Sequence, residues 1–503
     1  MLVIEHHNNK IVKVLFDNEI DHEFTNQNIV TSLIPIAKKH PKNIVIWCQT
    51  DALPYINFSE IHTLIDSERK FISYNPTSNF FSDSIGYVEE SPFININKEV
   101  SYPTWQMSSL VGATSSNSIL KFDPQFFKIE DFDYFLCSIA KHYMSLGLFC
   151  YSEPRLLTKK NNFKSKKASS KQLFQFVGQH YKPIWKFLLF LNLLLYQKKL
   201  SVIPLFSSLM TKKLLFSREL ENKVDTISIF NEEIDVIIPT IGRKQYLYDF
   251  LNDLNRQTHL PKNVIIVEQN PQANTSSELD YLNEKWNFTI KHIFTHQTGA
   301  CNARNEAIKL IKSKWVFFAD DDIRIRENFI EQALKKTTAN KIDALVFKCL
   351  NPNENEDKDN SNIAQTTIFG SGSSIVKLKE TIYFNTKLEF GYGEDMEYGL
   401  QLRQNGIDVF YSNSPSITHL KAPIGGFRYK HDFPWDNDII KPLPSPTVLL
   451  YKKIFYTKEQ VLGFKSVLFL SLFQTKKWKE KVELIFNFNK HWNKSNFWAN
   501  KLK

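Results

Sequence analysis

The sequence has few cysteines and lacks the spacings that bind zinc or build a disulfide framework. Its five cysteines are scattered, odd in number and without a CxxC pair, which favours a reducing compartment. The first ten residues soon become polar and do not resemble a secretory signal. No apolar run reaches the roughly 20 residues that a membrane-spanning helix needs. These absences lead us to expect a cytoplasmic protein.

The nearest approach to a long apolar run is FLLFLNLLLY at residues 187–196, which lies among lysines such as Lys182, Lys186, Lys198 and Lys199. Two interpretations are open. The run is a buried helix that packs two domains together, or a helix that lies in the interface of a membrane. In the second case its lysines contact anionic headgroups at the inner face of the cell membrane.

The composition is that of a globular protein, with 42% hydrophobic and 23% charged residues. A length of 503 residues is too great for one ordinary core and predicts two or three domains. The net charge of +10 favours acidic partners, namely phosphates, anionic lipid or nucleic acid, without choosing among them.

Changes of pattern along the chain predict four segments. Residues 1–157 alternate short apolar runs with polar turns and predict a first α/β domain. Residues 158–232 begin as a basic linker and continue as a Leu- and Phe-rich helical connector. Residues 233–445 form the main α/β domain, and residues 446–503 form a basic helical tail.

From residue 233 onward, strands and helices alternate. We expect buried strands at residues 234–238, 264–267, 290–294, 315–319 and 344–349, with helices around residues 247–254, 302–312 and 329–334. This alternation predicts a mainly parallel, Rossmann-like sheet with both faces covered. Ligands of such sheets bind at the carboxyl ends of the strands.

Three adjacent carboxylates, Asp320, Asp321 and Asp322, follow the predicted strand WVFFA at that edge. Because their charges repel, they need a cation or a structural reason to stay together. A divalent Mg²⁺ or Mn²⁺ ion, with substrate phosphates completing its shell, is one explanation. A solvated acidic turn before the helix at residues 326–335 is the other.

A second cluster, GYGED at residues 391–395, precedes a helical stretch at residues 396–404. Its glycines allow the backbone to approach a ligand closely. The acidic pair Glu394 and Asp395 begins the helix. Asp395 either caps the helix N-terminus or acts as a general base at the mouth of the crevice.

Two more groups are candidates for charge stabilisation. Arg304 pairs with a diphosphate or an aspartate of the triplet, or it forms a surface salt bridge. His419 precedes a basic loop with Gly425, Gly426 and Arg428, which favours metal and phosphate contacts, although a lone histidine is more often structural.

The order and spacing of these motifs resemble the family 2 glycosyltransferases of the GT-A fold. The matching segments within residues 234–420 are VIIPTIGR at 236–243, VIIVEQ at 264–269, GACNARNEAI at 299–308, FFADDD at 317–322 and GYGEDMEYGLQLRQNG at 391–406. The resemblance implies nucleotide-sugar contacts from Pro239, Thr240, Arg243, Glu268, Arg304, Asp320 and Asp321. It implies a metal site at Asp322 and His419, and a catalytic base at Asp395 with Glu394 beside it.

The same resemblance implies the reaction. An acceptor hydroxyl displaces a nucleoside diphosphate with inversion, and Mn²⁺ or Mg²⁺ together with Arg304 stabilises the leaving group. Glu268 stands where the family usually has an aspartate that reads the base, which leaves the base open. QLRQ at residues 401–404 lacks the tryptophan of the QxxRW motif, which predicts a non-processive enzyme. The partners implied are a nucleotide sugar and a glycan or lipid-linked glycan of a cell-surface polysaccharide, with no nucleic acid.

The N-terminal part repeats some of this pattern. NIVIWCQ at residues 43–49 resembles NVIIVEQ at 263–269, GATSS at 112–116 resembles GSGSS at 370–374, and LGLFCYS at 146–152 resembles residues 405–412. No acidic triplet accompanies these segments. We expect a smaller, degenerate GT-A-like domain that positions an acceptor or partner and performs no chemistry. Chance similarity between short apolar strands is the alternative.

Two other functions compete with sugar transfer. A sugar nucleotidyltransferase also holds a metal on carboxylates, but its first strand should lead into a Gly-rich loop with lysine, whereas PTIGR at residues 239–243 has one glycine. A non-catalytic nucleotide- or nucleic-acid-binding protein suits the positive charge, but the lysines concentrate in the linker and the C-terminal tail.

Overall fold

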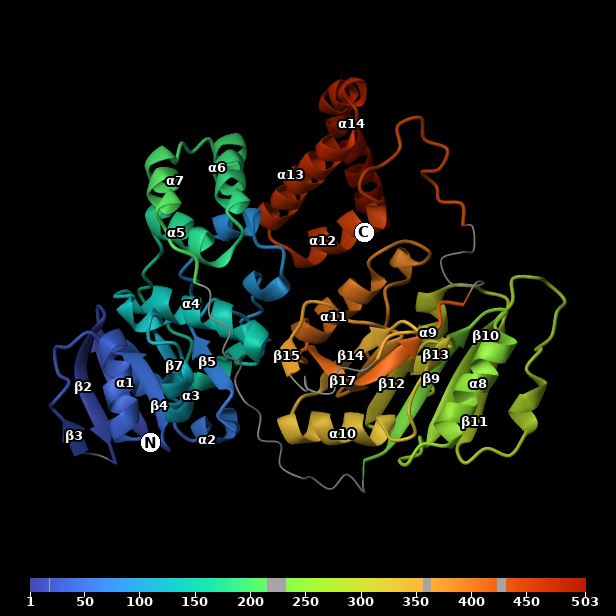
Figure 1. Ribbon diagram of the computed structural model, residues 1–503, viewed down its shortest axis with the longest axis horizontal. Coiled ribbons are helices and arrows are strands. Elements are labelled where there is room, and N and C mark those ends of the chain that lie inside the picture. Colours follow the sequence, from blue (N-terminus) through green and yellow to red (C-terminus); the bar gives the residue numbers. More distant parts are fainter. Residues whose placement is uncertain (18, 215–231, 356–362, 423–430) are drawn as a thin grey trace. The chain divides into compact units, whose positions relative to one another are not determined.

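The computed structural model describes residues 1–17, 19–214, 232–355, 363–422 and 431–503. The predicted phosphate-contacting residues Gly425, Gly426 and Arg428 lie outside these ranges. The described residues divide into two compact units (Figure 1). The first contains the residues up to 214 together with Phe455–Lys477, and the second contains the residues from 232 to 454 together with Trp478–Lys503.

The second unit is built on a nine-stranded sheet in the order β11-β10-β9-β12-β16-β14-β17-β13, with β15 paired to β17. Its strands are β9 (Ile234–Thr240), β10 (Asn263–Gln269), β11 (Thr289–Thr295), β12 (Trp315–Ala319), β13 (Ile323–Arg324), β14 (Ala344–Leu350), β15 (Ile363–Gln365), β16 (Ser373–Lys377) and β17 (Phe410–His419). The four strands β11, β10, β9 and β12 are parallel, as the βα alternation predicts. The sequence pattern did not indicate β16, which runs antiparallel between β12 and β14.

The helices of this unit are α8 (Lys244–Asn255), α9 (Ala300–Ile308), α10 (Phe329–Asn340), α11 (Glu394–Gln404), α12 (Pro446–Phe455) and α14 (Trp478–Leu502). Some of them cover the two faces of the sheet. On β12, the ring of Phe317 lies 6.5 Å from Phe250 of α8 and 5.4 Å from Phe329 of α10. The ring of the next residue, Phe318, lies 5.6 Å from Tyr398 of α11. Because successive side chains of a strand point to opposite faces, α8 and α10 cover one face and α11 covers the other.

This packing fixes the strand that carries the acidic triplet. Phe317 and Phe318 are almost completely buried, and burial of each such side chain contributes about 1.5–3 kcal/mol. The parallel neighbours β9 and β12 end at Thr240 and Ala319. The residues that follow both strands therefore meet at one edge of the sheet.

The first unit has its own eight-stranded sheet in the order β3-β2-β1-β4-β7-β5-β8-β6. Its strands are β1 (Leu2–His7), β2 (Lys10–Phe16), β3 (Glu19–Asp21), β4 (Ile44–Gln49), β5 (Lys70–Tyr74), β6 (Tyr102–Pro103), β7 (Val111–Ser115) and β8 (Phe149–Ser152). Its helices are α1 (Ile29–Lys39), α2 (Ile61–Leu64), α3 (Ser116–Lys121), α4 (Phe132–Tyr143), α5 (Ser170–His180), α6 (Ile184–Gln197), α7 (Val202–Leu209) and α13 (Lys458–Thr475).

The two sheets share most of their topology. The run β1-β4-β7-β5-β8-β6 has the same relative strand directions as β9-β12-β16-β14-β17-β13. They differ at the other end, where β2 and β3 pair antiparallel but β10 and β11 pair parallel. The first unit is therefore a degenerate GT-A-like α/β domain. In it, the antiparallel strands β2 and β3 stand beside β1, where the second unit has the parallel strands β10 and β11 beside β9.

One detail of the sequence comparison was wrong. It aligned residues 43–49 with residues 263–269, but β4 takes the position of β12, the strand before the acidic triplet, and not that of β10. Short apolar strands look alike in sequence, and only their pairing distinguishes them. Gln49, Thr50 and Asp51 therefore stand where the second unit has three aspartates.

The described helices of the connector and tail belong to different units. The helices α5, α6 and α7 are part of the first unit. In the tail, α12 and α14 belong to the second unit and α13 to the first. The boundaries at residues 157, 232 and 445 stay predictions. Among the described residues, no helix combines the length and apolar character needed to cross a membrane.

Candidate active site

A cavity of about 460 Å³ lies at the carboxyl ends of β9 and β12. It is lined by ten of the side chains predicted from sequence, namely Pro239, Thr240, Arg243, Arg304, Asp320, Asp321, Asp322, Glu394, Asp395 and His419. The structure brings these side chains together because residues at the ends of neighbouring strands converge at this edge of the sheet.

Asp321 is held by groups at the end of β9 and just after it. Its Oδ2 accepts a hydrogen bond from Thr240 Oγ1 at 2.6 Å, and its Oδ1 accepts one from Arg243 Nη1 at 2.7 Å. Burial raises the pKa of Asp321 to about 6, although Arg243 and Thr240 act in the opposite direction. Asp321 is only 2% exposed. The triplet is therefore not the solvated turn considered from sequence, and Asp321 links the ends of β9 and β12.

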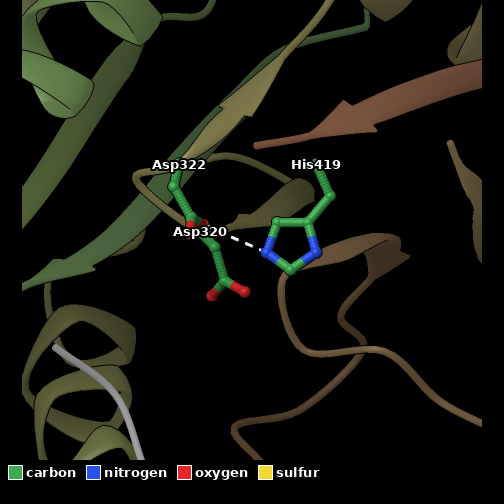
Figure 2. Close-up of side chains that lie close together, drawn as sticks. All are labelled: Asp320, Asp322 and His419. Carbon is green, nitrogen blue, oxygen red and sulfur yellow. Dashed lines mark ion pairs between the residues drawn. The ribbon is translucent and has the colours of Figure 1, made fainter. Parts of the chain in front are cut away.

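Asp322 lies beside His419 and Asp320, as Figure 2 shows. Its Oδ1 is 3.3 Å from His419 Nε2, and its Oδ2 accepts a hydrogen bond from Ala422 N at 2.9 Å. Burial alone would raise the pKa of Asp322, but the bonds from His419 and Ala422 and the charge of Arg243 lower it. The hydrogen bond with Asp322 raises the pKa of His419.

These three side chains can hold a metal ion. One ligand atom from each of Asp320, Asp322 and His419 lies within 4.8 Å of the others. Asp322 Oδ1 is buried and faces His419 Nε2 at 3.3 Å. A cation would satisfy this oxygen, so the structure fits the predicted Mn²⁺ or Mg²⁺ and adds Asp320 to its ligand set.

Arg304 lies between the triplet and the second acidic cluster. Its Nη2 donates to Asp320 Oδ1 at 2.9 Å. Burial would lower the pKa of Arg304, but the negative charges of Asp320 and Asp395 raise it. The side chain of Arg304 is 6% exposed and that of Asp320 is 37% exposed. The arginine is therefore buried at the wall of the cavity and does not form the surface salt bridge that was the alternative.

Asp395 is the second residue of α11 and does not cap it. The cap is Gly393, and Asp395 Oδ1 accepts hydrogen bonds from Ser371 N at 3.3 Å and from Ser371 Oγ. Burial raises the pKa of Asp395, against the opposing charge of Arg304. Burial and the neighbouring charge of Asp395 raise the pKa of Glu394 to about 7.

The glycines of the GYGED segment have a structural function. A Cβ on Gly391 would lie 2.5 Å from Thr447 Cγ2, and one on Gly393, where φ is 107°, would lie 2.4 Å from Tyr451 Cε1. Thr447 and Tyr451 belong to α12. Both glycines therefore allow α12 to pack behind this loop. Gly391 also lines the cavity, and its predicted close approach to a ligand stays a prediction.

Glu268 is outside the cavity lining. Its Oε2 lies 2.9 Å from His292 Nε2, and its Oε1 accepts a hydrogen bond from Glu278 N at 3.1 Å. Both carboxylate oxygens therefore contact the protein. Its predicted role toward the base stays a prediction.

Sequence reasoning missed three residues that line the cavity. Glu389 accepts hydrogen bonds from Cys301 N at 3.0 Å and Asn302 N at 2.7 Å, at the start of α9. Gln269 Oε1 accepts one from Gly299 N at 2.6 Å. Ser371 orients Asp395. Gln269 had a sequence signal, because it ends the VIIVEQ segment at residues 264–269.

Comparisons with known proteins agree with this site. Residues 235–393 match the model of glycosyl transferase family 2. The chain is 26% identical over 119 residues to poly(ribitol-phosphate) beta-N-acetylglucosaminyltransferase TarS of Staphylococcus aureus strain Mu50, covering 23% of this chain and 21% of TarS. It is 26% identical over 129 residues to glycosyltransferase GlyA of Streptococcus pneumoniae serotype 4, covering 25% of this chain and 18% of GlyA. The chain thus spans about a fifth of the length of these relatives.

Among solved structures, TarS residues 1–349 in complex with UDP-GlcNAc align with 52% of this chain and 79% of that one, at 19% identity and a TM-score of 0.37. A second crystal structure of S. aureus TarS aligns with 38% of this chain and 37% of that one, at 22% identity and a TM-score of 0.31. The matched family segment runs from β9 through the acidic triplet to Gly393, and it includes most of the cavity lining. Residues 235–393 are therefore a family 2 glycosyltransferase domain with a GT-A fold.

Proposed function

We propose that this chain transfers a sugar from a nucleoside-diphosphate sugar to an acceptor hydroxyl in one inverting, metal-dependent displacement. The observation that carries the proposal is the composition of a single cavity. It holds a cation-binding set, Asp320, Asp322 and His419, and a separate buried carboxylate, Asp395. A transferase needs both, one group of residues for the leaving diphosphate and one for the acceptor proton.

On the donor side, Asp320, Asp322 and His419 would hold Mn²⁺ or Mg²⁺. When bound, the ion supplies positive charge that stabilises the departing diphosphate. Arg304 adds a second positive charge in the same cavity, and its contact with Asp320 fixes its position. Pro239, Thr240 and Arg243 line the part of the cavity at the end of β9, where we propose that the nucleotide binds.

On the acceptor side, Asp395 is the proposed general base. Ser371 binds its Oδ1 and so orients the carboxylate, and Oδ2 takes the proton of the acceptor hydroxyl. The acceptor oxygen forms a bond to the anomeric carbon while the bond from that carbon to the diphosphate oxygen breaks. The nucleoside diphosphate leaves with both electrons of that bond, and the single displacement inverts the anomeric centre.

We further propose a non-processive enzyme at the cytoplasmic face of the membrane. Its acceptor would be a glycan or lipid-linked glycan of a cell-surface polysaccharide. The absence of the QxxRW tryptophan from QLRQ at residues 401–404 supports addition of one or a few sugars. UDP-GlcNAc is the first donor to test, because one TarS structure contains it.

The test is a panel of nucleotide sugars, incubated with the full-length chain and Mn²⁺ or EDTA. We expect cation-dependent release of a nucleoside diphosphate from one donor, and NMR of the product with an accepted glycan should show the inverted anomer. Release of pyrophosphate would indicate a nucleotidyltransferase. Donor binding without turnover in the presence of acceptor glycans would indicate a binding protein.

A further inference from the structure

We propose that α6 and α7 in the first unit form a docking surface for an anionic membrane. Between residues 184 and 210 the chain exposes eleven large hydrophobic side chains, which we call the α6–α7 surface: Ile184, Phe187, Leu191, Leu194, Leu195, Leu200, Val202, Ile203, Phe206, Leu209 and Met210. Ile203 and Met210 are 81% and 88% exposed. On α6 the exposed positions 184, 187, 191, 194 and 195 recur at helical spacing and so share one face. Exposed apolar side chains gathered in this way mark an interaction site.

The two helices are firmly held to their own unit. Lys198, with φ of 55°, ends α6 and reverses the chain. Lys186 of α6 is buried and its Nζ donates to Ser208 O of α7 at 3.1 Å. Beyond α7, Leu214 N donates to Gln179 O of α5 at 3.2 Å. The α6–α7 surface is therefore a fixed feature of the fold.

The inner face of α6 is already covered. Leu189 and Leu193 belong to the core of the first unit, and the buried Asn192 Oδ1 accepts a hydrogen bond from Ser466 Oγ of α13 at 2.6 Å. Figure 1 shows α6 and α7 on the side of α5 away from the β1–β8 sheet. α6 is thus apolar on two faces, and its own unit buries only one of them.

The charges around the surface identify its partner. The exposed lysines Lys182, Lys198, Lys199, Lys212 and Lys213 flank the two helices. No aspartate or glutamate occurs between Glu153 and Glu219. A second copy of this chain would bring lysines against lysines in a symmetric contact, which is unfavourable. Anionic headgroups above an apolar layer match both the lysines and the hydrophobic side chains.

The geometry fits a helix pair that lies on the membrane. With 14 and 8 residues, α6 and α7 are too short to cross a bilayer. Their exposed side chains would enter the boundary between headgroups and acyl chains. This binding is independent of the proposed sugar transfer, so each can be tested without the other.

The experiment measures co-sedimentation of the full-length chain with two kinds of vesicle. The neutral vesicles contain phosphatidylcholine alone. The anionic vesicles also contain roughly 30% phosphatidylglycerol, to imitate the negative surface of a cytoplasmic leaflet. The test variant is Ile203→Asp/Phe206→Asp, and the matched control is Ile439→Asp in the second unit, where the isoleucine is fully exposed. We expect binding to the anionic vesicles only, at least about tenfold weaker in the test variant and unchanged in the control.

A second pair of variants tests the charges. Changing Lys198, Lys199, Lys212 and Lys213 to glutamine should weaken binding by about fivefold per lysine and reduce its salt dependence. The control, Lys38→Gln/Lys42→Gln, removes exposed lysines of the same unit and should have little effect. Circular dichroism checks that each variant is folded.

Three results would overturn the proposal. They are equal binding to neutral and anionic vesicles, no loss in the Ile203→Asp/Phe206→Asp variant, or lipid-free dimers in analytical ultracentrifugation that this variant abolishes. Donor turnover in solution should be the same in wild type and variant. A failed vesicle assay with intact turnover would therefore leave the proposed function standing.

Discussion

Asp395 and Asp133 occupy equivalent positions in the two units. Each is the second residue of its helix, α11 or α4. Asp395 Oδ1 accepts a hydrogen bond from Ser371 N, and Asp133 Oδ1 accepts one from Ser109 N at 2.8 Å. Both serines lie two residues before the antiparallel strand of their sheet, β16 or β7. The first unit has thus kept the position of the proposed base without the acidic triplet.

Asp133→Asn should stabilise the protein at neutral pH and leave sugar transfer unchanged. Burial raises the pKa of Asp133 from 3.8 to about 6, so the folded state favours the protonated form. The contribution of Asp133 to the free energy of unfolding is highest below pH 4 and falls as the pH rises to about 6. The free energy lost is about 3 kcal/mol at most. Asparagine avoids this loss because it carries no charge, and it still accepts the hydrogen bond from Ser109 N.

Urea unfolding of wild type and Asp133→Asn at pH 4, 6 and 8 measures this effect. The two proteins should be equally stable near pH 4, and the variant should be more stable at pH 8. A variant that is less stable at pH 8 would show that the charge on Asp133 stabilises the first unit.

The positions of the acidic triplet and of Arg304 could be predicted because both depend on local order along the chain. Parallel strands end at a common edge, so Asp320 following a buried strand had to lie in the crevice. Ser371 could not be found this way. It lies 24 residues from Asp395 in sequence, and only the antiparallel course of β16 brings it to the base.

The packing of α12 behind the GYGED segment could not be predicted from the sequence either. The GYGED glycines look the same whether a ligand or a helix approaches them. Their neighbours Thr447 and Tyr451 come from a segment that the sequence placed in a separate tail. Likewise, β4 and β10 have similar sequences, and their different positions depend on pairing between residues far apart in the chain.

Asp322→Ala should remove the cation dependence of turnover together with most of the turnover. The variant loses the buried oxygen that faces Asp320 and His419. We expect a loss on the order of 10²–10³-fold, the usual effect of removing a group that stabilises the transition state. The control is Asp51→Ala, the exposed residue at the equivalent sheet position in the first unit.

Turnover against Mn²⁺ concentration is the measurement for this pair. Asp51→Ala should follow the wild-type curve. Full activity of the wild type in EDTA, or wild-type activity of Asp322→Ala, would refute the metal assignment.

Arg304→Gln should move the acidic limb of the pH–rate profile to higher pH. Burial raises the pKa of Asp395, and the positive charge of Arg304 opposes that rise. Without Arg304 the pKa of Asp395 rises further. The base then stays protonated, and inactive, up to a higher pH. The control is Arg256→Gln, which changes an arginine that is 57% exposed.

The measurement is kcat/KM from pH 4 to 9 for wild type and both variants. The Arg256→Gln profile should coincide with that of the wild type. An acidic limb that moves to lower pH in Arg304→Gln would exclude Asp395 as the group that titrates.

The turnover of Asp395→Asn tests the proposed chemistry most directly. Asparagine keeps the shape of the side chain and can still accept from Ser371, but it cannot take the acceptor proton. We predict a loss of roughly 10²–10⁴-fold in turnover with little change in donor affinity, because the metal and nucleotide contacts lie on other residues. Asp133→Asn, at the equivalent position of the first unit, should transfer sugar at the wild-type rate. A folded Asp395→Asn variant that binds donor and transfers sugar near the wild-type rate would contradict the account.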